Sequence, residues 1–188
     1  MMMMRVRTFP RLALVTALTV FFTQASFAGH RGSSGHAPPP PVQEPSQPTD
    51  RPDCMSKNNV LPIDNAQVLA WKTSTANQYL TRGHIQGKLV SAYPDRNGHH
   101  HWKVQIGPEA TDTVEVVYQI QFGPTPDVHP GQSIEACGDY ITSTAPGGGY
   151  DASPDGALIH WVHCNPSGHG HDSGYIAIDN NAYGTCSH

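Results

Sequence analysis

The sequence of 188 residues is poor in charged side chains, and especially in basic ones, with 11 lysines and arginines against 15 aspartates and glutamates. Three of the arginines lie within residues 1–28, so residues 29–188 hold 8 basic and 15 acidic residues. Binding of nucleic acid phosphates normally requires clustered lysine and arginine. The shortage of basic residues therefore argues against a nucleic acid partner.

Several motifs of enzymes and metal sites are also missing. The sequence contains no HExxH, no GxSxG and no cysteine pair spaced as CxxC. Their absence removes the common patterns of zinc proteases, serine hydrolases and zinc-thiolate sites. No catalytic residue can be assigned from the sequence, and whether the protein is an enzyme stays open.

Long apolar runs are absent except for one from Leu12 to Phe22, which is too short to cross a bilayer permanently. Three arginines precede this run, and Ser26-Phe27-Ala28 follows it with small residues at the two positions that a signal peptidase reads. We therefore predict a signal peptide over residues 1–28. The mature chain is then expected to be periplasmic or secreted and to have no membrane span.

The remainder divides by composition into two parts. Residues 29–53 are rich in Pro, Ser and Gly and almost devoid of large apolar side chains, so they cannot bury a core. We predict a disordered tether there. Residues 54–188 are numerous enough for one hydrophobic core, and we predict a single β-barrel domain over them.

The four cysteines all lie in this predicted domain, where export to an oxidising compartment favours disulfide bonds. Four cysteines allow three pairings. A hairpin centred near residues 150 and 151 would place Cys137 opposite Cys164, so this pairing is preferred. Cys54 and Cys186 would then join the two ends of the domain.

The hydrophobic pattern predicts one helix followed by strands. Asp64 can cap a helix that runs to about Leu80, with Gly83 as a stop. Five strand patterns follow, each bounded by turn residues, over residues 84–93, 101–106, 114–122, 132–141 and 157–163. We predict a mainly β fold, a five-stranded OB-like small barrel with one N-terminal helix. A small sandwich is the alternative.

Histidines concentrate in two places, in the run at residues 99–101 and between residues 160 and 171. In an OB-like barrel, the loops after strands one and four frame the ligand face, so both groups would border that face. Imidazole is a common ligand of zinc, copper and nickel. The sequence therefore suggests a divalent transition metal bound by residues from this set: His160, His163, His169, His171, His99 and His101, supported by Asp172, Trp161 and Trp102.

The spacing within the HWVH segment weakens this interpretation. Alternation along a strand would place His160 and His163 on opposite faces, so they could share a metal only if the strand bends or ends between them. Trp161 alternates with Ile159, and a core position is the more expected one for its large side chain.

Two further classes of function stay open. A metal-assisted hydrolase of a phosphodiester or a cell-wall polymer would need a metal with an open coordination position and a general base. A non-catalytic module that binds a polymer or a protein would instead use exposed aromatic rings.

The segments GQSIEACGDYI and GALIHWVHCNPSGHGHDSGY resemble an uncharacterised bacterial family, the domain of unknown function 3465. The resemblance is strongest over residues 131–175. It rests on these residues: Gly138, Asp139, Tyr140, His160, Trp161, His163, Pro166, His169 or His171, Gly174 and Tyr175. Two departures are the Val117-Tyr118-Gln119 segment, which lacks a histidine of the family pattern, and Cys164, which replaces a polar residue. The resemblance implies export and a compact β domain, and it brings no established activity.

Overall fold

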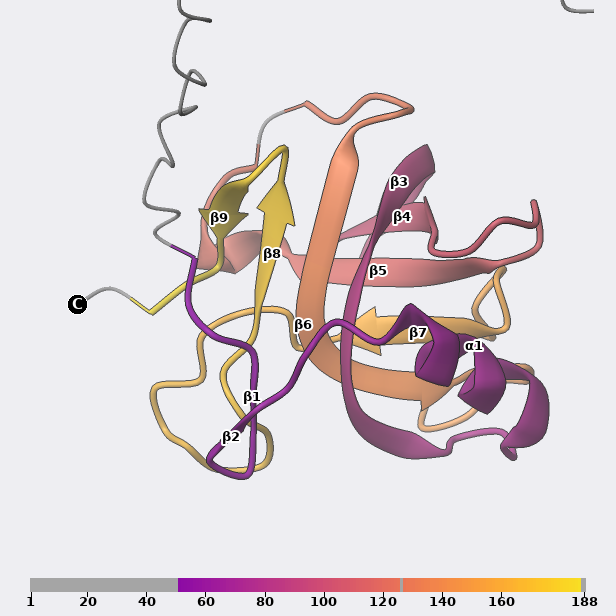
Figure 1. Ribbon diagram of the computed structural model, residues 1–188, viewed down its shortest axis with the longest axis horizontal. Coiled ribbons are helices and arrows are strands. Elements are labelled where there is room, and N and C mark those ends of the chain that lie inside the picture. The colour runs from indigo at the N-terminus through magenta and orange to yellow at the C-terminus, as the bar shows by residue number, and fades with distance from the viewer. Residues whose placement is uncertain (1–50, 126, 187–188) are drawn as a thin grey trace, which may run out of the picture. The chain divides into compact units, whose positions relative to one another are not determined.

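The computed structural model describes residues 51–125 and 127–186. The predicted signal peptide and residues 29–50 of the predicted tether lie outside these ranges. Within them the fold is mainly β, with one α-helix, one short 3₁₀ helix and nine strands (Figure 1). The described part of the chain contains no helix that could cross a membrane.

Helix α1 spans Asn65–Ser74 and begins where the sequence predicts, because the Asp64 side chain accepts a hydrogen bond from the Gln67 backbone amide at 2.9 Å. It ends earlier than predicted. The hydroxyl groups of Ser74 and Thr75 donate to backbone carbonyls four residues back, and Thr75 is already extended. Such hydroxyls compete with the helical hydrogen bonds, so the chain is free to enter a strand by Leu80.

Five strands account for most of the sheet, and all five correspond to predicted strand patterns. They are β3 (Leu80–Arg96), β4 (His99–Gln105), β5 (Thr113–Gln119), β6 (Ser133–Thr142) and β7 (Ala157–His160). The 3₁₀ helix η1 (Ile120–Phe122) follows β5. The short strands β1 (Met55–Ser56), β2 (Asn59–Val60), β8 (Tyr175–Ile178) and β9 (Asn181–Tyr183) were not predicted.

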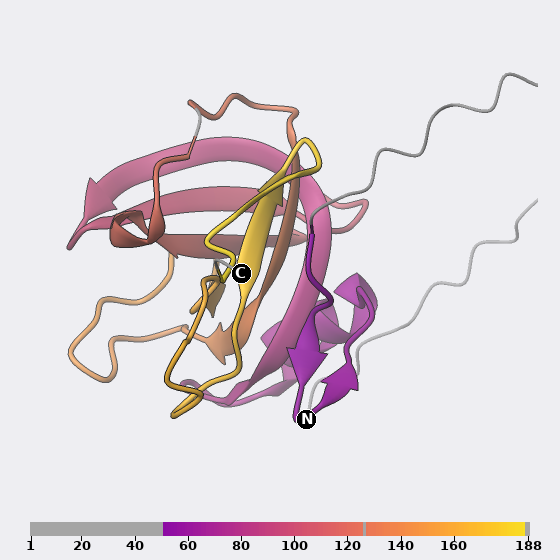
Figure 2. The ribbon, with the colours of Figure 1, turned by 90° about the vertical axis from the view of Figure 1, so that its left-hand side faces the viewer.

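The main sheet has seven strands in the order β3-β4-β5-β7-β6-β8-β9, and β3 also pairs with β6. Strand β3 is long and strongly curved (Figure 2), so that its first half pairs with β6 and its second half with β4. Neighbouring strands are antiparallel except for β5 and β7, which are parallel. The sheet therefore departs from the predicted five strands by adding β8 and β9 beside β6.

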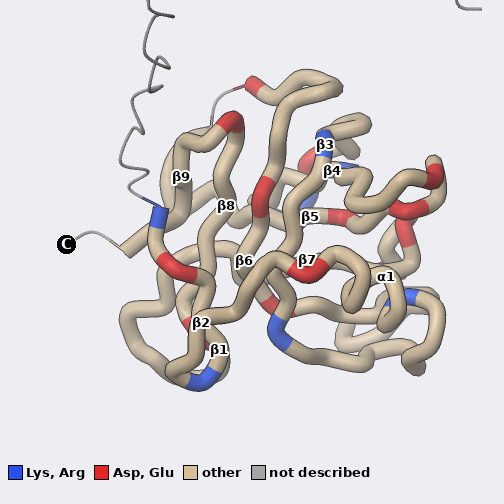
Figure 3. The backbone as a smooth tube through the Cα atoms, viewed as in Figure 1, with Lys and Arg blue, Asp and Glu red and all other residues tan. Residues whose placement is uncertain are grey.

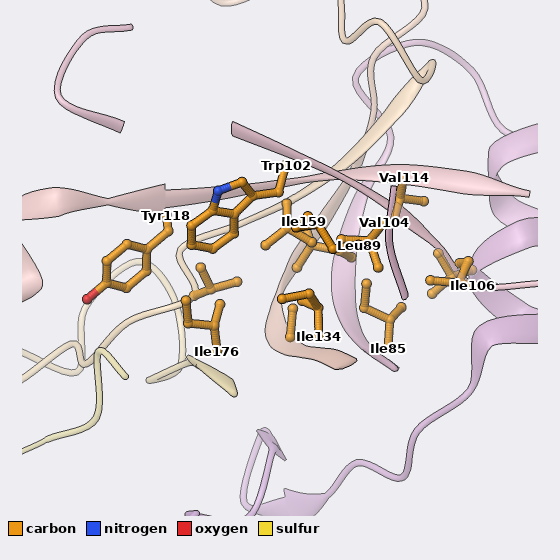
Figure 4. Close-up of a cluster of buried hydrophobic side chains, with 14 of the residues drawn as sticks. Ile85, Leu89, Trp102, Val104, Ile106, Val114, Tyr118, Ile134, Ile159 and Ile176 are labelled. Carbon is orange, nitrogen blue, oxygen red and sulfur yellow. The ribbon is translucent and has the colours of Figure 1, made fainter. Parts of the chain in front are cut away.

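One face of the sheet forms the hydrophobic core. The side chains that meet there alternate along their strands, and Figure 4 shows Trp102 and Tyr118 at one end of the cluster and Ile106 at the other. Trp102 is 2% exposed, so it fills the core and does not face a ligand. Because side chains in a strand alternate between faces, the neighbours of these core residues lie on the opposite face of the sheet.

Both disulfides exist, but their pairing differs from the preferred one. Cys54 pairs with Cys137, and Cys164 pairs with Cys186. The β6–β7 ladder pairs Asp139 with His160, so a continued β7 would place Val162, not Cys164, opposite Cys137, and the strand in any case ends at His160. Trp161 then adopts a left-handed backbone conformation (φ 50°), which turns the chain away from β6. Two disulfides fit the oxidising environment that export would provide.

Candidate functional site

A pocket of about 360 Å³ lies on the face of the sheet opposite the core. In β4, Trp102 and Val104 point into the core, whereas His99 and His101 point into the pocket. Residue His160 at the end of β7 also lines it, as does Trp161. The two histidine groups that are far apart in the sequence therefore meet at one pocket.

A buried histidine–carboxylate pair forms one wall of the pocket. His101 Nδ1 lies 2.6 Å from Glu115 Oε1, and Arg96 Nη2 lies 3.0 Å from the same oxygen. Burial opposes ionisation of Glu115, but the hydrogen bond from His101, a contact with the Ser153 hydroxyl and the positive charge of Arg96 outweigh it and hold the pKa of Glu115 below its ordinary value. Glu115 accepts the Nδ1 proton of His101, so Nε2 is the ring nitrogen that this contact leaves free.

Two buried polar atoms of this pair have no hydrogen-bond partner among the described residues, namely His101 Nε2 and Glu115 Oε2. Buried polar side-chain atoms almost always have a partner, and each one left without costs about 1–3 kcal/mol. These two are the only such side-chain atoms in residues 51–125 and 127–186. Both belong to the same pair at the pocket wall.

A second buried pair of the same kind provides a comparison. His84 Nε2 lies 3.0 Å from Glu135 Oε1, which also accepts a hydrogen bond from the Tyr175 hydroxyl. His84 Nδ1 lies 2.8 Å from the Leu61 carbonyl, and Arg51 binds the other oxygen of Glu135. Every polar side-chain atom of this pair therefore has a hydrogen-bond partner, which identifies the pair as a structural contact.

His99 and His160 bring two more imidazoles to the pocket. The ring centroids of His99 and His160 are 5.3 Å apart, and those of His99 and His101 are 6.2 Å apart. His99 Nδ1 donates to the Asn97 carbonyl at 2.9 Å, which leaves Nε2 available. Burial lowers the pKa of His160 to about 4, assisted by the neighbouring histidines, so its ring is neutral at pH 7.

The predicted alternation fails directly after His160. Trp161 does not enter the core, as its alternation with Ile159 had suggested; it is half-buried and lines the pocket instead. Val162 takes the core position. The left-handed Trp161 backbone breaks the strand alternation between His160 and His163.

His163 and His171 lie next to these residues but outside the pocket lining. Their rings are 5.5 Å apart, and His171 stacks against Trp161 with centroids 5.6 Å apart. His163 stacks on Phe122, and burial lowers the pKa of His163. Each ring donates from Nδ1 to a backbone carbonyl at 2.9 Å, His163 to Cys164 and His171 to Asp172.

Two other predicted site residues lie elsewhere. His169 is exposed in the loop before β8 and does not line the pocket. The Asp172 carboxylate accepts a hydrogen bond from the Lys57 backbone amide at 2.9 Å, in the turn between β1 and β2. Asp172 therefore anchors that hairpin through its carboxylate, and its only contact with a histidine ring among the described residues is the hydrogen bond that its backbone carbonyl accepts from His171.

Sequence reasoning missed Glu115, whose role depends on strand register. Lys103 pairs with Glu115 and His101 with Val117 in the β4–β5 ladder, so Glu115 lies diagonally across from His101. A single glutamate in the apolar TVEVVYQ segment was the available signal. It is fully buried, and a carboxylate in such a position requires partners.

Asp155 was missed as well. It accepts hydrogen bonds from Tyr93 at 2.8 Å and Thr113 at 2.6 Å, and Lys103 lies 3.4 Å away. These contacts fasten the base of the loop between β6 and β7, which covers the pocket.

Among the described residues, no three His, Cys, Asp or Glu side chains are close enough to hold a metal ion without moving. Comparison of the chain with protein-family models, curated proteins and solved structures gives no match. Along residues 51–125 and 127–186, lysines and arginines are few and scattered (Figure 3). The assignment of a function therefore rests on the pocket itself.

Proposed function

We propose that the pocket binds a divalent transition metal, zinc, copper or nickel, through His99, His101 and His160. The observation that carries the proposal is the buried His101 Nε2, which has no partner among the described residues while Glu115 holds Nδ1. Histidines that bind a metal almost always donate their other ring proton to a carboxylate or a carbonyl. His101 and His99 both have such an arrangement.

The spacing of the three rings supports this proposal. Two imidazoles on one tetrahedral zinc, with Zn–N distances of about 2.1 Å, have their ring centroids about 5 Å apart and their ligating nitrogens about 3.4 Å apart. The observed centroid separations are 5.3 and 6.2 Å. Both separations exceed the expected value, so the half-buried side chains of His99 and His160 would have to rotate to complete the set. His163 and His171 carry the other imidazole rings nearest to this set.

The protonation state favours metal binding near neutral pH. A metal ligand must be a neutral imidazole, and the lowered pKa of His160 keeps its ring neutral down to moderately acidic pH. The ionised Glu115 adds a negative charge beside the positive charge of a metal. The pocket therefore offers three imidazole side chains and a carboxylate behind one of them.

A metal-assisted hydrolase is the second candidate, and the free volume of the pocket favours it. A site that only holds a metal needs no space beside its ligands, whereas a catalytic site keeps an open position for water or substrate. Arg96 is the cation closest to Glu115, and its side chain is 41% exposed at the pocket. It is the side chain placed to stabilise negative charge on a reacting group.

We infer in addition that strands β3 to β7 form an OB-like barrel in an exported protein. Its support is the pairing order β3-β4-β5-β7-β6, which returns to β3 through the β3–β6 pairing. Two disulfides and the leader-like residues 1–28 support export. Membership of the domain of unknown function 3465 family is likewise a proposal, based on the segments quoted above.

The test is metal retention by the protein expressed with its own leader and purified without an affinity tag. After dialysis against a mild chelator, we expect about one zinc, copper or nickel ion per chain by elemental analysis. His99→Ala and His160→Ala should each abolish retention. His100→Ala is the matched control, because His100 stacks on Trp102, away from the pocket. Retention that is equal in all four proteins would refute the site.

A further inference from the structure

The pocket has an apolar floor that extends away from the histidines. Leu80 in β3 pairs with Ile141 in β6, and Ile141 pairs with Leu158 in β7. All three side chains line the pocket. They form a continuous strip across three neighbouring strands, which we call the apolar strip.

The apolar strip leads to the histidine–carboxylate pair. Leu158 pairs with Glu115 in the parallel β5–β7 ladder, and Glu115 binds His101. Neighbouring strands are about 4.8 Å apart, so the strip from Leu80 to Glu115 is about 14 Å long. One end is thus apolar and the other carries His101, His99 and His160.

The cover over this strip is incomplete. The loop between β6 and β7 is fixed at its base by Asp155, while its tip carries Gly147, Gly148 and Gly149 followed by Tyr150. Tyr150 lines the pocket and yet is 68% exposed, and Leu80 is 54% exposed. Large apolar side chains left open around a pocket indicate a surface that a ligand covers.

We propose that the pocket takes a small acyl compound, whose oxygen-bearing head group lies at the histidines and whose aliphatic chain lies along the apolar strip. The position of the head group rests on the proposed metal site, whereas the position of the chain rests on Leu80, Ile141 and Leu158 alone. A volume of about 360 Å³ is at the lower end of the range for small-molecule sites, which suits a ligand of this size.

The charges of the pocket select the head group. Arg96 is balanced by Glu115, and Lys103 is balanced by Asp155. A bound divalent cation would make the pocket positive overall, apart from Asp151 at the loop. Carboxylate, hydroxamate and carbonyl oxygens therefore fit the histidine end, and a cationic head group does not.

The test is a series of straight-chain hydroxamates, from acetohydroxamate to octanohydroxamate, titrated into the zinc-loaded protein by calorimetry. Each CH₂ group buried on the apolar strip should tighten Kd by about fourfold. Zinc retention is measured after each titration. An alkyltrimethylammonium of matched length should not bind. A Kd that does not change with chain length overturns the proposal.

Leu80→Gln is the variant that tests the position of the aliphatic chain. Leu80 is exposed, so its replacement should not prevent folding. We expect octanohydroxamate to bind at least tenfold more weakly to this variant, while acetohydroxamate and zinc bind as before. Equal affinity of octanohydroxamate for both proteins would contradict the assigned position of the chain.

A parallel series of carboxylates on the metal-free protein separates the two proposals. If no zinc binds but affinity still rises with chain length, the metal site is wrong and the acyl site stands. If zinc binds and chain length has no effect in either series, the metal site stands and the acyl site is overturned.

Discussion

His101 donates its Nδ1 proton to Glu115 across strands β4 and β5, over 2.6 Å, and each residue keeps one buried polar atom without a partner in the described chain. The pair formed by His84 and Glu135 has the same chemistry and is fully saturated. The two pairs differ in that only His101 and Glu115 line the pocket and keep polar atoms without partners among the described residues.

Glu115→Gln tests this relationship. The amide keeps the shape of the side chain but loses the charge that orients the His101 ring, so zinc affinity should fall by about 10- to 100-fold. Competition with a chromogenic chelator measures this change.

Glu135→Gln is the matched control, because Glu135 is also buried against a histidine but lies away from the pocket. It should lower the free energy of unfolding and leave zinc affinity unchanged. A loss of zinc affinity that is equal in the two variants would mean that Glu115 has no special role.

Acid stability should depend on His160. The pKa of His160 is about 4 in the folded protein and about 6.5 when unfolded, so the unfolded chain binds more protons between these values. The free energy of unfolding should therefore fall as the pH drops from 7 to 4, by about 2–3 kcal/mol. Urea unfolding at half-unit pH intervals measures it.

His160→Asn should flatten much of this dependence. His163 adds to the same window, because its pKa is also lowered, whereas Glu115 begins to contribute near its ordinary pKa of 4.5, at the acid end of this window, and continues to do so below it. His129→Asn, at an exposed position, is the control and should follow the wild-type curve. A wild-type curve from His160→Asn would show that His160 is not buried as described.

The sequence predicts the strands and the helix start more closely than it predicts the site. The Asp64 cap and the alternating patterns of β3 to β6 depend on neighbouring residues, which a sequence displays directly. The turn at Trp161 does not depend on neighbouring residues in this way, because a left-handed backbone at a bulky residue is imposed by tertiary contacts. That one residue ends β7 and places its own side chain at the pocket instead of in the core.

Glu115 shows a second reason why the site could not be predicted from the sequence. Its importance follows from the register between β4 and β5, which cannot be read from local patterns. The short strands β8 and β9 could not be predicted from the sequence either, since elements of four and three residues carry little periodicity.

The disulfides should differ in their resistance to reduction. Cys54 and Cys137 are buried, whereas Cys164 and Cys186 are partly exposed, so the second bond should be reduced first. Timed dithiothreitol treatment, alkylation and peptide mass mapping will show both the order and the pairing. Simultaneous loss of the two bonds would contradict the difference in access.

Loss of each bond should also have a distinct energetic cost. The sequence separations are 83 residues for Cys54–Cys137 and 22 for Cys164–Cys186. The loop-entropy relation then gives about 4.5 and about 3.4 kcal/mol respectively. Double Cys→Ala variants unfolded in urea measure these differences. A larger loss for the shorter loop would mean that native contacts, rather than the unfolded chain, determine the effect.

Gly138→Ala should damage both the fold and the site. A Cβ atom at Gly138 would lie 2.3 Å from the His160 carbonyl oxygen, so β7 would have to move away from β6 and take His160 with it. We expect a loss of about 1–3 kcal/mol in the free energy of unfolding, together with weaker zinc binding. Gly87→Ala is the matched control, because its Cβ would lie 2.1 Å from the Gln105 carbonyl oxygen, away from the pocket. It should cost similar stability and spare zinc affinity, since overpacking there displaces β4 near its far end and leaves His160 in place. If both variants lose zinc equally, metal binding reports only on general stability, and the position of His160 against β6 has no separate part in it.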